Sequence, residues 1–80
     1  MYYVYLIRSL KDASKTYIGY TAGLKQRLKT HNSGSSIHTK QFRPWKLVVY
    51  VAFDEEEKAL VFEKYIKVGA GYAFAKKRFW

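Results

Sequence analysis

The chain has 80 residues, of which 49% are apolar and 19% aromatic, so it can bury one compact core but not two, and it is not a disordered chain. Fifteen Lys and Arg against six Asp and Glu give a net charge of +9. Because each neutralised phosphate releases counterions, this excess favours nucleic acid as the partner.

Cysteine is absent, which excludes disulfides and thiolate metal sites and favours a reducing, cytoplasmic location. The apolar run from Val4 to Ile7 is far too short for a signal peptide or a membrane span. No long basic amphipathic helix of the membrane-surface type is present either. We therefore expect no membrane association.

Two strands open the chain. Residues 2–9, "YYVYLIRS", and 16–21, "TYIGYT", are rich in aromatic and β-branched side chains, and a polar turn at 11–15 separates them. Strands this close in sequence most simply form an antiparallel hairpin. A register that pairs Leu6 with Ile18 keeps the apolar side chains on one face. The period of two then sends one group of residues together to the other face: Tyr3, Tyr5, Tyr17 and Gly19.

A helix is predicted over residues 23–33. Thr21 or Ala22 lies near its start, and "NSG" at 32–34 is a signal that ends a helix. Leu24 and Leu28 are expected to form its buried seam. Arg27 and His31, spaced i and i+4, form an adjacent stripe. That stripe is either part of a solvated basic face or one wall of a site for something negative.

The second half of the chain reads as loop, strand, helix and closing helix. A polar loop over 35–44 precedes a strand at 45–53. Asp54 and Glu57 have the spacing of a capping box, which predicts that the second helix begins at Asp54 and runs to about Val68. Gly69 and Gly71 are expected to break it. The last segment, "YAFAKKRFW", is expected to form a short basic helix, in which Phe79 and Trp80 either cap the core or lie at a dimer contact.

Glu63 differs from the other acids of the second helix. The stripe of Ala59, Phe62 and Ile66 faces the core, and Glu63 lies beside it without a capping or dipole role. A single Glu in this position commonly extends to solvent. It is nevertheless the acid best placed to bind a metal ion.

These residues have ordinary structural readings when taken singly, but as a set they suit one chemistry. Two tyrosines on one sheet face, Arg27 on one helix and Glu63 on another would supply a proton acceptor, a cation for developing charge and a metal ligand. Together these three functions would stabilise the cleavage of a phosphodiester bond.

The order of short motifs resembles the GIY-YIG endonuclease superfamily. The motifs are "YVY" at 3–5, "YIG" at 17–19, Arg27 ten residues after Tyr17, and a later helical Glu. Tyr3 occupies the place of the Gly in the family name. "RLKTHNSG" and "FAKKRF" are similar to segments of its small stand-alone bacterial members. The resemblance implies a single α+β domain over residues 1–80, with a three-stranded antiparallel sheet flanked by helices in the order β-β-α-β-α-α.

The resemblance also implies roles for individual residues. Glu63 would hold one Mg²⁺ or Mn²⁺, either Tyr5 or Tyr17 would be the general base, and Arg27 would hold the charge of the transition state. His31 would support them by bonding a phosphate oxygen or a tyrosine. The remaining candidates would contact the nucleic-acid backbone: Gly19, Lys40, Arg43, Lys76, Lys77 and Arg78.

The sequence therefore predicts a metal-dependent endonuclease that hydrolyses phosphodiester bonds in DNA, structure-selective or of low sequence specificity, in repair or recombination. Two alternatives stay open. One is a non-catalytic nucleic-acid-binding module that retains the nuclease fold. The other is an accessory subunit that is active only with a partner. A protein partner that supplies specificity and a homodimer are both compatible with the sequence.

Overall fold

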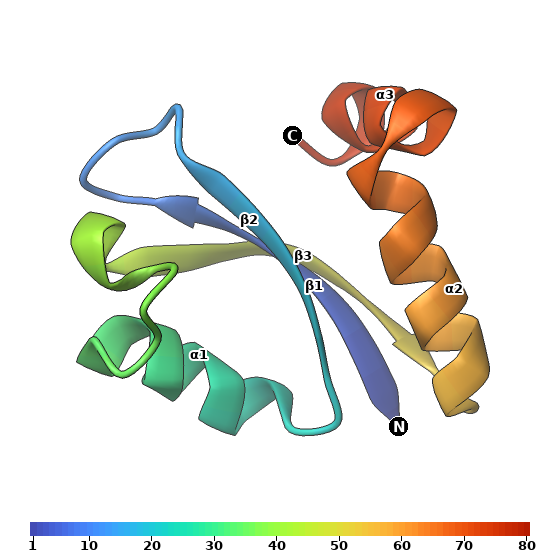
Figure 1. Ribbon diagram of the computed structural model, residues 1–80, viewed down its shortest axis with the longest axis horizontal. Helices are drawn as coiled ribbons and strands as arrows, with labels where there is room; N and C mark the ends of the chain where they lie inside the picture. The colour runs from blue at the N-terminus through green and yellow to red at the C-terminus, as the bar shows by residue number, and fades with distance from the viewer.

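A three-stranded antiparallel sheet lies at the centre of the molecule. The computed structural model describes residues 1–80, and the strand order is β2-β1-β3, so the N-terminal strand is the middle one. Helix α1 lies on one side of the sheet, and helices α2 and α3 lie on the other (Figure 1). The α+β class and the predicted element order are confirmed. In chain order the elements are β1 (Tyr2–Ser9), β2 (Thr16–Thr21), α1 (Leu24–Ser33), the short 3-10 helix η1 (Lys40–Phe42), β3 (Trp45–Phe53), α2 (Glu56–Lys67) and α3 (Gly69–Arg78).

The predicted hairpin register is confirmed. Leu6 pairs with Ile18 and Val4 pairs with Tyr20. Because side chains alternate along a strand, Val4 and Leu6 point to one face while Tyr5 and Ile7 point to the other. The two faces of β1 therefore belong to two different clusters of side chains.

The face toward α2 and α3 carries the apolar core. Its fully buried members are Val4, Leu6, Ala59, Ile66 and Ala75. The two C-terminal aromatic residues, Phe79 and Trp80, pack against this cluster, so of the two predicted positions they take the one that caps the core. None of the helices combines the length and the apolar character that crossing a membrane requires.

Helix α1 ends as predicted, at Gly34 in the left-handed conformation, but its buried side differs from the expectation. Leu24 and Leu28 are only half-buried, and the fully buried residue of α1 is His31. His31 therefore does not share an exposed stripe with Arg27. The spacing explains the error, because His31 lies seven residues after Leu24 and three after Leu28, and so falls on the face of the two leucines.

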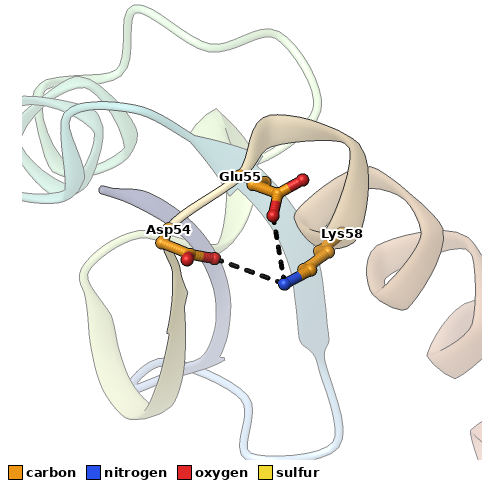
Figure 2. Close-up of polar contacts among 3 residues, drawn as sticks. All are labelled: Asp54, Glu55 and Lys58. Atoms are coloured by element: carbon orange, nitrogen blue, oxygen red, sulfur yellow. Dashed lines mark ion pairs between the residues drawn. The ribbon is translucent and has the colours of Figure 1, made fainter.

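The predicted capping box of α2 is wrong. The helix begins at Glu56, and no side chain caps its N-terminus. Lys58 instead holds both preceding acids, with its ammonium 3.6 Å from the Asp54 carboxylate and 3.2 Å from that of Glu55 (Figure 2). The two acids before α2 therefore pair with Lys58, and neither carboxylate bonds the amides of the first turn.

The break between α2 and α3 is shorter than predicted. Gly69, with φ +57, turns the chain, and α3 begins there rather than at Tyr72. Gly71 does not break a helix; it lies inside α3, against the Tyr65 carbonyl. A Cβ at position 71 would overlap that carbonyl oxygen, so this residue permits the close approach of the two helices.

Candidate active site

Three aromatic rings meet on the sheet face that α1 covers. Tyr5 of β1 and Tyr17 of β2 have ring centroids 6.4 Å apart, and the His31 ring lies 5.7 Å from Tyr5 and 5.2 Å from Tyr17. The strands bring the tyrosines together because both belong to the face opposite Val4 and Leu6. Helix α1 then places His31 over them. We call these three residues the tyrosine–histidine cluster.

A chain of buried hydrogen bonds runs through this cluster. The Tyr5 hydroxyl lies 2.8 Å from Nε2 of His31, and Nδ1 of His31 lies 2.7 Å from the Thr39 hydroxyl. The backbone carbonyl of Thr39 in turn accepts a hydrogen bond of 2.8 Å from the Trp45 indole N–H. Both ring nitrogens of His31 are thus occupied, and the loop before β3 is tied to α1 and to the sheet.

The electrostatics of the cluster fix the direction of these hydrogen bonds. Burial, and then the charge of Arg27, lower the pKa of His31, so its imidazole is neutral near pH 7. Burial, with a smaller contribution from Tyr17, raises the pKa of Tyr5 to about 12, so its phenol keeps its proton. The Tyr5 O–H therefore donates to Nε2, and the N–H on Nδ1 donates to the Thr39 hydroxyl oxygen.

Gly19 makes room for the Tyr5 ring. A Cβ at position 19 would lie 2.4 Å from both the hydroxyl oxygen and the adjacent ring carbon of Tyr5, and these are the ring's own rigid atoms. Gly19 is the cross-strand partner of Tyr5, which explains the close approach. Gly19 was predicted to let a phosphate approach the backbone. The ring of Tyr5 covers Gly19 on the side where a Cβ would lie, and the phosphate contact stays a prediction.

Arg27 and Glu63 approach the cluster from different layers. Arg27 is exposed on α1, and its positive charge lowers the pKa of both Tyr5 and His31. Glu63 lies on α2, which packs against β1 and β2, and its side chain is 19% exposed. Its negative charge contributes the smallest of the rises in the pKa of Tyr5. The carboxylate forms an ion pair of 3.0 Å with Lys67.

The donor set determines which kind of metal ion could bind here. The molecule has no group of three or more His, Cys, Asp or Glu side chains placed to hold a metal. A closed structural site, as for zinc, is therefore not built by these residues. Mg²⁺, by contrast, keeps several waters and binds through one or two carboxylates together with substrate phosphates. The half-buried carboxylate of Glu63 fits that mode of binding.

The predicted backbone-contacting cations lie in two separate places. Lys40 and Arg43 belong to η1 and its C-terminal flank, on the α1 side of the sheet. The other three, Lys76, Lys77 and Arg78, form the last turn of α3, on the far side (Figure 1). All five are exposed. Helix α1 adds three cations of its own and contains no acid, so the α1 side is the more uniformly positive of the two.

Thr39 is the site residue that sequence reasoning missed. It is fully buried and fixes the orientation of the His31 ring. Nothing local to the loop marks it, because it is one of several polar residues between Ser35 and Lys40. The burial of His31 did have a sequence signal, its helical spacing from Leu24 and Leu28.

Comparison with known proteins identifies relatives over most of the chain. The family model described as the GIY-YIG catalytic domain matches residues 1–70. A UPF0213 protein of Streptococcus pyogenes is 43% identical over 60 residues, which cover 72% of this chain and 65% of that protein. The structure-specific endonuclease subunit SLX1 of Candida dubliniensis is 41% identical over 69 residues, 78% of this chain and 24% of that protein.

A solved structure shares the fold as well. The solution NMR structure of the UPF0213 protein BH0048 from Bacillus halodurans aligns with a TM-score of 0.57 and 30% identity, covering 99% of this chain and 87% of that one. The chain spans about two thirds of the length of its streptococcal relative and about a quarter of the length of the Candida protein.

Proposed function

The chain belongs to the GIY-YIG family, and on that premise we propose that it is a metal-dependent endonuclease that hydrolyses phosphodiester bonds in DNA. The observation that carries the proposal is the tyrosine–histidine cluster, with Arg27 at its side and Glu63 in the adjoining layer. The relative described as a structure-specific endonuclease subunit supports a substrate selected by its structure, for which we propose branched DNA in repair or recombination.

Glu63 is the proposed metal ligand. A Mg²⁺ or Mn²⁺ ion held there would polarise the scissile phosphate and stabilise the leaving 3′-oxygen. The chain contributes one carboxylate, so water and substrate oxygens complete the coordination. Lys67 holds the same carboxylate at 3.0 Å and therefore competes with the ion.

Arg27 and Tyr17 are the proposed contacts to the reacting groups. Arg27 is exposed and permanently charged, so its guanidinium can bind the phosphate and the negative charge that develops on it. Tyr17 is half-buried, and its hydroxyl has no hydrogen-bond partner within the protein and is not enclosed. It is therefore free to accept the proton of the attacking water.

Tyr5 has a positioning role in this proposal. It is fully buried, its hydroxyl is already bonded to His31, and its pKa of about 12 keeps it protonated. The hydrogen bonds from Tyr5 through His31 to Thr39 fix the rings against which Tyr17 packs. This assignment chooses between the two tyrosines by burial and by the hydrogen bonds already made.

The experiment is a cleavage assay on supercoiled plasmid and on branched DNA, with Mg²⁺ or Mn²⁺, comparing wild type with Glu63→Gln. Glutamine keeps the size of glutamate and its helix propensity but loses the charge that a hard cation requires. Cleavage should fall by orders of magnitude, whereas DNA binding should stay the same or strengthen.

Glu57→Gln is the matched control, because it removes the same charge from an exposed acid of the same helix that makes no ion pair. It should cleave like wild type. Equal cleavage by wild type and Glu63→Gln would contradict the metal-ligand role of Glu63. No cleavage by wild type on any substrate would contradict the endonuclease proposal and favour a non-catalytic nucleic-acid-binding module.

A second candidate is a nuclease domain that acts only with a partner subunit. The observation that favours it is a group of exposed apolar side chains that line one shallow hollow on α2 and at its junction with α3: Val61, Tyr65 and Val68. Light scattering of the purified chain measures its molar mass, and so shows whether a second copy of the chain covers these side chains. A monomer would leave them to a different partner. A monomer that binds DNA but does not cut it supports the need for a different subunit.

A further inference from the structure

A hollow lies beside the tyrosine–histidine cluster, between the first turns of α1 and the sheet. Its volume is about 710 Å³, and its lining includes Tyr3 and Tyr50 from the sheet and Lys25, Gln26, Leu28 and Lys29 from α1. We call it the α1 hollow. None of the candidate catalytic residues lines it.

The α1 hollow is next to the proposed active site in three ways. Tyr3 lies two residues before Tyr5 on the same face of β1, and Tyr50 of β3 is the cross-strand partner of Tyr5. On the helix, Gln26 and Leu28, the two neighbours of Arg27, both line the hollow. A strand whose phosphate contacted Arg27 would therefore have its next nucleotides at the hollow.

Two aromatic rings that contact each other line the sheet side of the hollow. The Tyr3 and Tyr50 rings pack edge to face with centroids 5.8 Å apart, and Tyr50 is 50% exposed. A half-exposed tyrosine held by a second ring is a surface on which a nucleobase can stack.

The helix side of the hollow supplies positive charge. Lys25 and Lys29 lie one turn apart on α1, and no acid lines the hollow. Asp12 is the one acid in residues 1–53, and it does not line the hollow. Aromatic rings on one side and ammonium groups on the other match the two parts of a nucleotide, its base and its phosphate.

We propose that the α1 hollow binds an unpaired nucleotide of single-stranded DNA, with its base against Tyr50 and its phosphates at Lys25 and Lys29. The inference deepens the proposed function and rests on it, because it names the feature that makes the substrate structure-selective. A base in duplex DNA is already stacked and must be displaced at a cost, whereas a branch or a flap offers an unstacked base.

The test measures binding of a fluorescent oligothymidylate and of a blunt duplex by anisotropy, in chelator so that no strand is cut. Tyr50→Leu removes the ring but keeps apolar bulk, and Tyr50→Phe keeps the ring. Base–aromatic stacking predicts that Tyr50→Leu weakens single-strand binding about tenfold or more, and duplex binding by less than about twofold. Tyr50→Phe should bind like wild type.

Tyr65→Leu is the matched control, because Tyr65 is also 50% exposed but lies on α2, away from the hollow. It should leave both affinities unchanged, and thermal unfolding verifies that each variant folds. Unchanged single-strand binding by Tyr50→Leu overturns the proposal and leaves a different occupant, such as an apolar segment of a protein. An equal loss on both forms of DNA also overturns it.

The outcome is separable from that of the endonuclease proposal. Wild-type cleavage of branched DNA with Mg²⁺ is measured in parallel. If wild type cleaves and Tyr50→Leu binds single strands unchanged, nucleotide binding in the α1 hollow is contradicted and the endonuclease proposal stands. If Tyr50→Leu selectively loses single-strand binding and wild type does not cleave, nucleotide binding in the α1 hollow is supported and the endonuclease proposal is contradicted.

Discussion

The two faces of one three-stranded sheet are built in opposite ways. Toward α2 and α3, the buried side chains are aliphatic and make no polar contact among themselves. Toward α1, the buried side chains include a tyrosine, a histidine and a threonine joined by hydrogen bonds. The same strand, β1, supplies both faces from alternate residues.

This difference assigns stability mainly to one face and chemistry mainly to the other. Burying aliphatic groups stabilises a fold at no polar cost, whereas a buried polar group is tolerated only while its hydrogen bonds are satisfied. The α1 face therefore has more to lose from a small change of geometry. Proteins keep such networks where a fixed arrangement of polar groups is needed.

The largest effect is expected from the two tyrosines of the α1 face. Tyr17→Phe should slow cleavage by about a thousandfold, because it removes the proposed proton acceptor. Tyr5→Phe should slow it less and lower the free energy of unfolding by about 1–3 kcal/mol, because buried Nε2 of His31 loses its donor. Single-turnover cleavage and urea unfolding measure the two effects. The reverse pattern would make Tyr5 the base.

The apolar face should respond in stability alone. Ile66 is fully buried in the apolar core, so Ile66→Ala should lower the free energy of unfolding by about 3 kcal/mol. The fraction that remains folded should cut DNA at the wild-type rate. Leu60→Ala, on the exposed side of the same helix, is the control and should change stability little. A large loss of cleavage by folded Ile66→Ala would break the division between the faces.

Gly19 tests how tightly the α1 face is packed. Gly19→Ala should destabilise the fold by about 2 kcal/mol, because the added methyl overlaps the Tyr5 ring. Combining it with Tyr5→Leu should cost less than the sum of the two single changes, since the leucine side chain ends short of the tyrosine hydroxyl. Urea unfolding of the four proteins gives this coupling. Strict additivity would mean that Tyr5 is not what position 19 accommodates.

Acidification should lower the free energy of unfolding, because His31 is buried in the α1 face. The folded pKa of His31 lies below its ordinary value of 6.5, so on acidification the unfolded chain takes up a proton that the folded chain refuses. Stability is therefore complete above about pH 6.5 and declines as pH falls from there toward the lower, folded pKa. His31→Gln, which does not titrate, should show a smaller decline between about pH 7 and pH 5 in urea unfolding. An identical decline would assign the effect to other groups.

The smallest expected effect concerns the ion pair of Glu63. Lys67→Gln should lower the Mn²⁺ concentration for half-maximal binding a few-fold, because the lysine no longer competes for the carboxylate. Manganese electron paramagnetic resonance measures binding directly, and cleavage gives a second readout. Lys64→Gln, which removes an unpaired cation from the same helix, should shift it less. Equal shifts for Lys67→Gln and Lys64→Gln would mean that the overall loss of positive charge, and not the ion pair with Glu63, causes the change in Mn²⁺ binding.

Local patterns in the sequence were sufficient for the sheet. The alternation in "YYVYLIRS" and "TYIGYT" specified which residues share a face, and the register followed because a slip by one residue would mix the faces. The start of α2 was mispredicted for a physical reason as well. Asp54 has the spacing of a cap, but in the structure its carboxylate pairs with Lys58 and bonds no amide of the first turn, and the spacing alone does not distinguish these outcomes.

The sequence by itself determined the strands, their pairing and the placement of Tyr5 and Tyr17 on one face, because each depends on neighbours within a few residues. Only the tertiary structure decided that the His31 ring packs against both tyrosines, that Thr39 orients this ring, and that the charge of Glu63 acts on Tyr5 from the opposite layer. These relations depend on how α1, α2 and the loop before β3 dock onto the sheet. Docking is set by packing over the whole domain, which no local spacing encodes.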